Sequence, residues 1–189
     1  VYMSKKDNAY KLFNRDRIEW RLQFEEELFE MIDCLYNCTS ICCWVPFNEG
    51  WGQFDALEIG YKVKEYDPSR FVDHASGWHD QGAGHFQSKH IYFKPLRAKA
   101  DNRILSVSEC GGFGYVMEGH TTGTTFGYTV CPTTDKLLEK LTKLFAEAGG
   151  LMMKEGLSVL VYTQLTDVED EVNGLLTYDR AVLKVDPHT

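Results

Sequence analysis

The stretch that decides the fold is ICCWVPFNEGWG, residues 41–52. Residues 41–47 carry no charge, and Asn48 and Glu49 then place an amide and a carboxylate side by side. A continuous apolar run of this kind favours a strand covered on both faces, as parallel strands are in α/β proteins. A glutamate that directly follows such a strand is either a paired structural charge or a group placed for proton transfer.

The segments around this strand predict alternating helices and strands. Helical spacing of apolar residues predicts helices over 17–36, with Asp16 as cap, over about 54–65, and over 133–150, with a threonine cap and Gly149 at the end. Further strands are predicted at 71–76, 90–93, 103–109 and 157–165. The connections among the first three of these strands are short and lack convincing helices. This weakens a purely parallel sheet, because parallel strands need crossover connections of a dozen or more residues. Because no Gly-rich nucleotide loop follows a strand, this order favours part of a (β/α)8 barrel over an open nucleotide-binding sheet.

Composition restricts the class of protein. With 189 residues, 43% of them hydrophobic, the chain can bury one core, and we expect a single domain over residues 1–189. The net charge of −8 and the lack of a Lys/Arg cluster argue against a nucleic-acid partner. No apolar run is long enough to span a membrane, so we expect a soluble protein, either cytoplasmic or periplasmic.

Cysteines and histidines raise the question of a metal. The six cysteines are too sparse for a disulfide framework and are expected to be free, buried thiols. Neither the cysteines at 34, 38 and 42 nor the histidines at 74, 79, 85 and 90 have the spacing of a common zinc site. We therefore expect no metal and no cofactor, and a thiol- or histidine-based metal protein is the weakest of the alternatives.

Two predicted strands end in glutamate, at Glu49 and Glu109. Active sites of (β/α)8 barrels gather at the C-terminal ends of the strands, so the two acids can face each other across one opening. A carboxylate pair suits glycosidic hydrolysis, in which one acid protonates the leaving oxygen while the other, ionised, attacks the anomeric carbon or activates water. The structural alternative is two salt-bridged acids at the rim of the barrel.

Several motifs carry a specific resemblance. They are WVPFNEGWGQFD, FVDHASGWHDQGAGH, HIYF, ILSVSECGG and VYTQLTDVEDEVNGLLTYDR. Together they resemble the C-terminal part of the catalytic barrel of glycoside hydrolase family 2, which includes β-galactosidases, β-glucuronidases and β-mannosidases, over roughly residues 16 to 182. The resemblance implies about strands four to eight. The first three strands and the β-sandwich domains that precede them in the family have no counterpart, and a complete barrel takes about 250 residues.

The resemblance also implies roles for individual residues. Glu49 would close the fourth strand as acid/base, and Glu109 the seventh as nucleophile of a retaining mechanism. Asn48 would hold the sugar 2-hydroxyl. His90 and Tyr92 would lie on the sixth strand near the nucleophile, where a tyrosine hydroxyl can help to keep Glu109 ionised.

The match is looser at the substrate-binding positions. Trp51 and Trp78 are candidates for stacking on sugar faces, with packing at the rim as the structural alternative. His85 and Ser88 stand where relatives often have acidic residues, Phe93 stands where a proline is usual, and the eighth strand does not end in tryptophan. These departures affect the identity of the sugar more than the type of reaction.

The sequence therefore predicts a fragment of a retaining, β-galactosidase-like glycoside hydrolase that acts on a carbohydrate substrate. The alternative is a carbohydrate-binding or structural half-barrel without turnover. An incomplete barrel exposes strand edges and apolar inner faces, so we also expect self-association through these edges and weak activity of the isolated chain.

Overall fold

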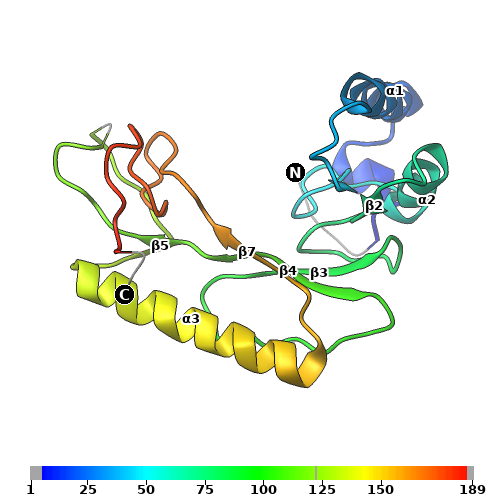
Figure 1. Ribbon diagram of the computed structural model, residues 1–189. Helices are drawn as coiled ribbons and strands as arrows, with labels where there is room; N and C mark the ends of the chain where they lie inside the picture. The colour runs from blue at the N-terminus through cyan, green and yellow to red at the C-terminus, as the bar shows by residue number, and fades with distance from the viewer. Residues whose placement is uncertain (1–5, 122, 187–189) are drawn as a thin grey trace. The chain divides into compact units, whose positions relative to one another are not determined.

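The structure is a computed structural model that describes residues 6–121 and 123–186 (Figure 1). The chain divides into two compact units. The N-terminal unit comprises Val1–His90 and Asp101–Ser106, and the C-terminal unit comprises Ile91–Ala100 and Val107–Thr189. Each unit is described by itself below.

The N-terminal unit contains the 3-10 helix η1 (Tyr10–Phe13) and the helices α1 (Ile18–Leu35) and α2 (Ala56–Tyr66). Both predicted helices are therefore confirmed. The predicted Asp16 cap is wrong, because the residue before α1 is Arg17, in an extended conformation without a side-chain cap. The start of α2 is instead capped from a distance, since the Asp7 carboxylate accepts the Ala56 N–H at 3.0 Å.

The strand at the centre of the sequence argument is shorter than predicted. β1 (Cys43–Trp44) pairs in parallel with β2 (Phe71–Val72), and an isolated parallel bridge joins Asn48 to Ser76 beyond them. Burial alternates along β1 and the residues after it: Trp44 and Phe47 lie in the core, whereas Val45 is 47% exposed. The prediction that the whole apolar run is buried is thus wrong, because Val45 is largely exposed.

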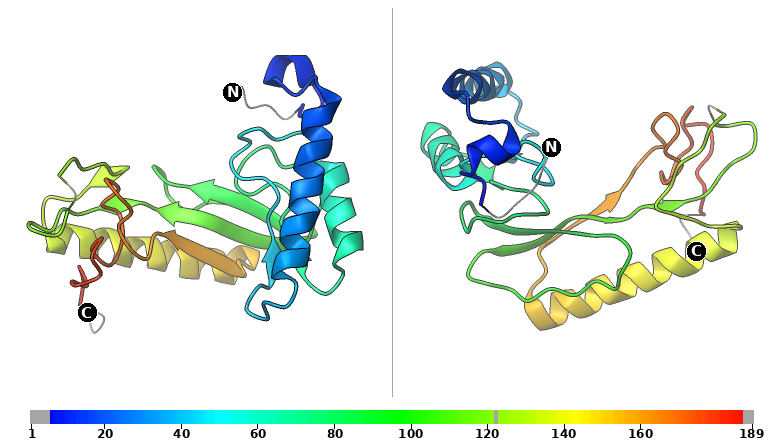
Figure 2. Two further views of the ribbon diagram at one scale, coloured as in Figure 1. Left: turned by 90° about the horizontal axis from the view of Figure 1, so that it is seen from above. Right: turned by 180° about the vertical axis from the view of Figure 1, so that it is seen from behind.

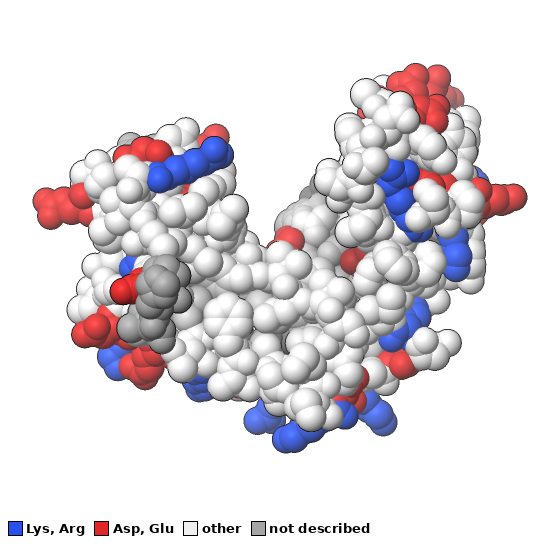
Figure 3. Space-filling view, viewed as in Figure 1, with Lys and Arg blue, Asp and Glu red and all other residues white. Residues whose placement is uncertain are grey.

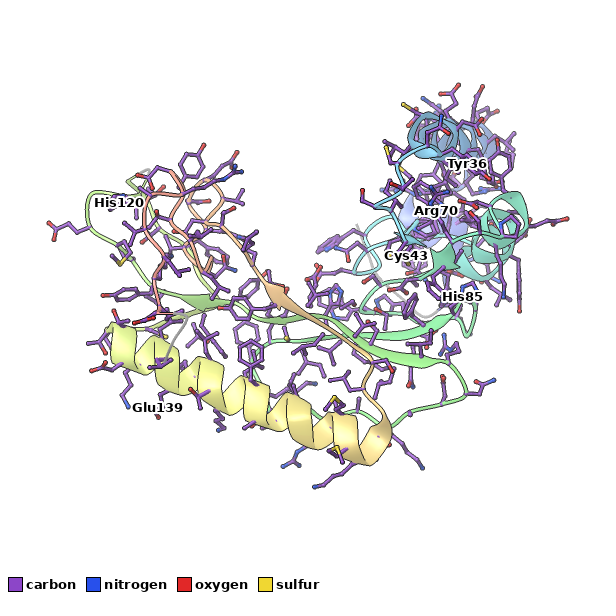
Figure 4. The ribbon with its side chains drawn as sticks, in the orientation of Figure 1. Tyr36, Cys43, Arg70, His85, His120 and Glu139 are labelled. Carbon is purple, nitrogen blue, oxygen red and sulfur yellow. The ribbon has the colours of Figure 1, made fainter. Side chains whose placement is uncertain are left out.

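A buried carboxylate closes the other end of this parallel pair. Asp67 accepts hydrogen bonds from Trp44 Nε1, from Arg70 Nη1 and from the Ser69 hydroxyl and N–H. Burial alone would raise the pKa of Asp67, but these hydrogen bonds outweigh burial and hold it well below its usual range. Arg70 also binds the Tyr36 carbonyl, which ties the end of α1 to this cluster (Figure 4).

A three-stranded sheet has the order β3-β4-β7, with β3 at Phe86–Ile91, β4 at Ile104–Gly111 and β7 at Val159–Thr163. The boundary between the units falls within β3 and β4. The predicted strands at 103–109 and 157–165 are confirmed. The strand predicted at 90–93 instead begins at Phe86, because its first half is polar and apolar content did not reveal it.

The C-terminal unit contains the long helix α3 (Thr134–Glu155), which runs alongside β5 (Phe113–Gly114) (Figures 1 and 2). β5 pairs in parallel with β6 (Thr129–Val130). The predicted threonine cap is confirmed at Thr133, whose hydroxyl accepts the Lys136 N–H. The predicted end at Gly149 is wrong, since the apolar face continues to Leu151 and the helix ends before Gly156, which has a φ of 72°.

A buried ion pair holds the irregular chain of this unit together. Lys184, 3% exposed, places its Nζ 2.7 Å from Asp167 Oδ1 and donates to the carbonyls of Tyr115 at 2.8 Å and Val172 at 2.9 Å. One cation therefore joins three separate segments that have little regular secondary structure of their own.

Some expectations concern the chain as a whole. No sheet closes into a barrel in the part of the chain that the structure describes, and a partial barrel stays a prediction. Among the helices described, none is long and apolar enough to cross a membrane. All six cysteines are free, but only Cys110 and Cys131 are buried, so the expectation of buried thiols is wrong for the exposed Cys34, Cys38 and Cys42. Acidic and basic side chains are interspersed on the face shown in Figure 3.

Candidate active site

Glu49 lies at the end of the short parallel pair in the N-terminal unit. Its N–H donates to the Ser76 carbonyl at 2.9 Å, which continues the pairing of Asn48 with Ser76. Glu49 has a φ of 54°, uncommon for a residue other than glycine, and Gly50 follows with a φ of 73°. This turn ends the strand pairing and leaves the Glu49 side chain 21% exposed.

His90, on β3, is the main partner of Glu49. The His90 side chain is fully buried, with Nδ1 2.9 Å from Glu49 Oε1 and Nε2 3.1 Å from the Ser76 hydroxyl. Gly77 makes room for the ring, because a Cβ on Gly77 would lie only 2.4 Å from it. The resemblance implied that His90 lies near the nucleophile. That placement stays a prediction; within its own unit, His90 contacts Glu49, the residue expected to act as acid/base.

The other predicted substrate-binding residues of this unit lie at its surface. Asn48 is exposed, Trp51 is 56% exposed, and Trp78 is 36% exposed with its ring centroid 6.5 Å from that of His90. Two exposed indoles in the segments that carry Glu49 and contact His90 are available to stack on a sugar ring.

The histidines that raised the question of a metal have other partners. His85 (labelled in Figure 4) accepts the Val72 N–H on Nδ1 at 2.9 Å. His74 Nε2 accepts the Gln81 N–H at 3.0 Å. Burial, and then the nearby Lys64, lower the pKa of His85, so its ring stays neutral and can accept. His74 and His85 thus hold backbone segments in place.

Glu109, on β4, has its partners in the C-terminal unit. The Tyr92 hydroxyl donates to Glu109 Oε2 and lies 3.1 Å from the Thr163 hydroxyl. Burial, and then the hydrogen bond to Glu109, raise the pKa of Tyr92 far above its usual value, so the phenol stays protonated. Its one hydrogen points to the carboxylate, and the Thr163 hydroxyl can donate to the phenol oxygen in turn.

An aromatic cluster surrounds Tyr92. Tyr128 stacks on Tyr92 with a centroid distance of 4.5 Å and an interplanar angle of 13°, and the rings of Phe93 and Phe126 meet Tyr128 edge-on at 5.7 Å. Phe93 is 74% exposed. Tyr128 and Thr163 were not predicted from the sequence. The loop around Tyr128 has no periodic pattern that would mark it. For Thr163, the available signal was a hydroxyl at the end of an apolar strand.

The two carboxylates thus have different proton environments, each within its own unit. Glu49 meets an imidazole, which can donate or accept a proton, whereas Glu109 accepts a hydrogen bond from a phenol that stays protonated. A donor of this kind favours the ionised form of a carboxyl group. This difference is the one that separates a general acid/base from a carboxylate nucleophile.

No protein-family model matches the sequence of this chain, and no curated protein matches it significantly. We therefore infer function from the local geometry of Glu49 and Glu109 and from the motifs that surround them.

Proposed function

We propose that the chain is the C-terminal part, about strands four to eight, of the catalytic barrel of a retaining glycoside hydrolase of family 2 that acts on β-galactosides. The observation that carries the proposal is the contrast between the two strand-end glutamates: Glu49 contacts an imidazole and Glu109 a protonated phenol. A retaining mechanism needs this pairing of a proton carrier with an ionised nucleophile.

The proposed reaction has two steps. The Glu109 carboxylate attacks the anomeric carbon while the glycosidic C–O bond breaks, and Glu49 gives its proton to the leaving oxygen. Water then attacks the anomeric carbon of the glycosyl ester, Glu49 takes the proton of this water, and the Glu109 carboxylate is released. Asn48 holds the 2-hydroxyl, and Trp51 and Trp78 stack on the sugar.

A second candidate is a carbohydrate-binding half-barrel without turnover. It is favoured by the large exposure of aromatic side chains, such as Trp51 at 56% and Phe93 at 74%. Both candidates predict sugar binding that weakens when these rings are removed, but only the first predicts turnover that depends on Glu109.

The test is azide rescue in the complete barrel, by which we mean this chain joined to the three strands that precede it in a family 2 barrel. Glu109→Ala should abolish hydrolysis of an aryl β-galactoside, and azide should restore turnover with an α-galactosyl azide as product, because azide takes the place of the nucleophile. Glu49→Ala should give the β-galactosyl azide, because azide then enters after the ester has formed.

The matched control is Glu139→Ala on α3, an exposed glutamate whose partner is Lys136 (Figure 4). This variant should hydrolyse the substrate at the wild-type rate. Wild-type turnover by the Glu109→Ala variant would overturn the proposal. Sugar binding without hydrolysis by the unsubstituted barrel would favour the second candidate.

A further inference from the structure

Glu49 is the open end of a buried chain of hydrogen bonds in the N-terminal unit. From His90, whose Nδ1 contacts Glu49, the chain runs through Nε2 to the Ser76 hydroxyl at 3.1 Å and from there to the Ser88 hydroxyl at 3.4 Å. The Ser88 hydroxyl is in turn hydrogen-bonded to the Asp73 carboxyl. The proposed acid/base is thus connected to a second carboxyl group.

The strand geometry explains why these groups meet. Ser88 and His90 are two residues apart on β3 and therefore point to the same face of the strand. Asp73 follows directly after β2 and Ser76 lies three residues further along the chain, and the Asp73 N–H is fixed by the Trp44 carbonyl at 3.0 Å.

The chain is closed to solvent everywhere except at Glu49. Asp73 is 5% exposed, Ser76 6% and Ser88 2%, and the His90 side chain is fully buried. Asp73 Oδ1 has no hydrogen-bond partner among the residues that the structure describes. A buried carboxyl group with an unpaired oxygen costs free energy in its ionised form. Its presence therefore calls for a structural or functional explanation.

The surroundings of Asp73 favour its protonated form. Burial raises the pKa of Asp73, and the hydrogen bond from Ser88 and the nearby His74 and His90 oppose this effect. Cys43 also lies close, but burial, and then Asp73 itself, raise the pKa of this thiol to about 12, so it carries no charge at neutral pH.

We propose that Glu49 and Asp73 share a single proton through His90, Ser76 and Ser88. In one state Glu49 is protonated and donates to His90 Nδ1, His90 Nε2–H donates to Ser76, Ser76 donates to Ser88, and Ser88 donates to ionised Asp73. In the other state Asp73 is protonated, each hydroxyl donates in the reverse direction, and His90 Nδ1–H donates to ionised Glu49. The two states have the same number of protons and the same charge.

Sharing a proton suits an acid/base. Loss of the last proton would put two negative charges on one buried chain, so the pair holds that proton up to a higher pH than a single carboxyl group would. A resting active site would then keep an acid available near neutral pH. Asp73 acts through the chain and is a positioning residue, and this part of the inference rests on the proposed function.

The first experiment reads the tautomer of His90 directly, in the 189-residue chain without substrate. We would measure the ¹⁵N chemical shifts of Nδ1 and Nε2 in wild type, Asp73→Asn and Ser88→Ala, with Glu65→Gln on α2 as a control at an exposed acid. In wild type and in the control, both shifts should lie between the values of the two neutral tautomers. In the two test variants, the shifts should move to those of a single tautomer.

Two variants are used so that the test still works if one of them misfolds. An amide spectrum like that of wild type shows that a variant is folded. Asp73→Asn keeps the shape of the side chain, whereas Ser88→Ala keeps Asp73 and breaks the chain. Identical His90 shifts in wild type and both variants would overturn the proposal.

The second experiment measures the pH profile of kcat/KM in the complete barrel. Asp73→Asn should move the basic limb to lower pH by about one unit, because the charge that holds the proton on the pair is lost. If the complete barrel hydrolyses glycosides but the His90 tautomer is the same in wild type and variants, the shared proton is refuted and the proposed function is not. If the His90 tautomer changes in the variants but the complete barrel hydrolyses no glycoside, the proposed function is refuted and the shared proton is not.

Discussion

Gly77→Ala should disable the site through His90 alone. Gly77 has a φ of 86°, and a Cβ added there would lie 2.4 Å from His90 Cγ, 2.5 Å from Nδ1 and 2.6 Å from Cδ2. Since carbon atoms in contact are about 3.5 Å apart, the ring must move by about 1 Å. The ring is fully buried, so it cannot swing out into solvent.

The size of the effect follows from this displacement. An alanine in the left-handed region costs about 1–2 kcal/mol, and overpacking a buried ring adds about 1–3 kcal/mol to the loss of folding stability. A shift of about 1 Å would also break the 2.9 Å contact with Glu49, and misplacement on this scale costs about 10²-fold in rate. We expect kcat/KM for an aryl β-galactoside to fall by about that factor in the complete barrel.

Gly82→Ala is the matched control in the same unit. Gly82 has a φ of 80°, but no atom lies within 4 Å of its added Cβ. This variant should therefore lose only the backbone term, about 1–2 kcal/mol by urea unfolding, and keep its kcat/KM. Equal kcat/KM in the two variants would refute the reasoning, because the contact with His90 is what distinguishes them.

Four further predictions follow from the same structure. Glu49→Ala should slow substrates with poor leaving groups more than activated ones, since only the former need the proton; equal losses across a leaving-group series would count against its role. An experimental structure of the complete barrel should place the carboxyl groups of Glu49 and Glu109 about 5 to 5.5 Å apart, and a separation beyond about 12 Å would exclude a shared site. The pKa of Asp67 is lowered in the fold, so its contribution to stability is present above pH about 4 and lost below it; urea unfolding should show this loss in wild type but not in Asp67→Asn, and equal acid sensitivity would contradict it. The isolated chain should hydrolyse nitrophenyl β-glycosides far more slowly than the complete barrel and should self-associate; turnover by a monomeric chain at the rate of the complete barrel would argue against the proposed place in a barrel.

Periodicity predicted the helices well because α2 and α3 each bury an apolar face, whereas α1 buries only Leu28 and Ile32 and leaves Ile18 and Leu22 exposed. The end of α3 was mispredicted because glycine alone does not stop a helix whose buried face continues, as it does through Leu151. The start of β3 was missed for a related reason. Its buried positions include Ser88 and His90, which are polar and are tolerated inside because both hydrogen-bond to the Ser76 hydroxyl.

The same physics decided which parts of the site could be predicted. A glutamate that directly follows an apolar strand can be recognised in the sequence, and Glu49 and Glu109 were predicted in this way. The partners that distinguish their protonation come from distant segments, as Ser76 and Thr163 do, and no local pattern marks them. A chain of buried hydrogen bonds depends on the three-dimensional register of several strands, which a single sequence does not reveal.

The buried cation at Lys184 sets an order of events during synthesis. Its hydrogen bonds to Asp167, Tyr115 and Val172 cannot form until residue 184 has left the ribosome. The N-terminal unit contains no residue after Ser106. Domains tend to fold as they emerge, so the Glu49 side of the molecule can be assembled while the segments around Glu109 still lack the last residue that secures them. During that interval, chaperones and proteases would act on a nascent chain whose N-terminal unit is folded and whose C-terminal unit is not yet folded.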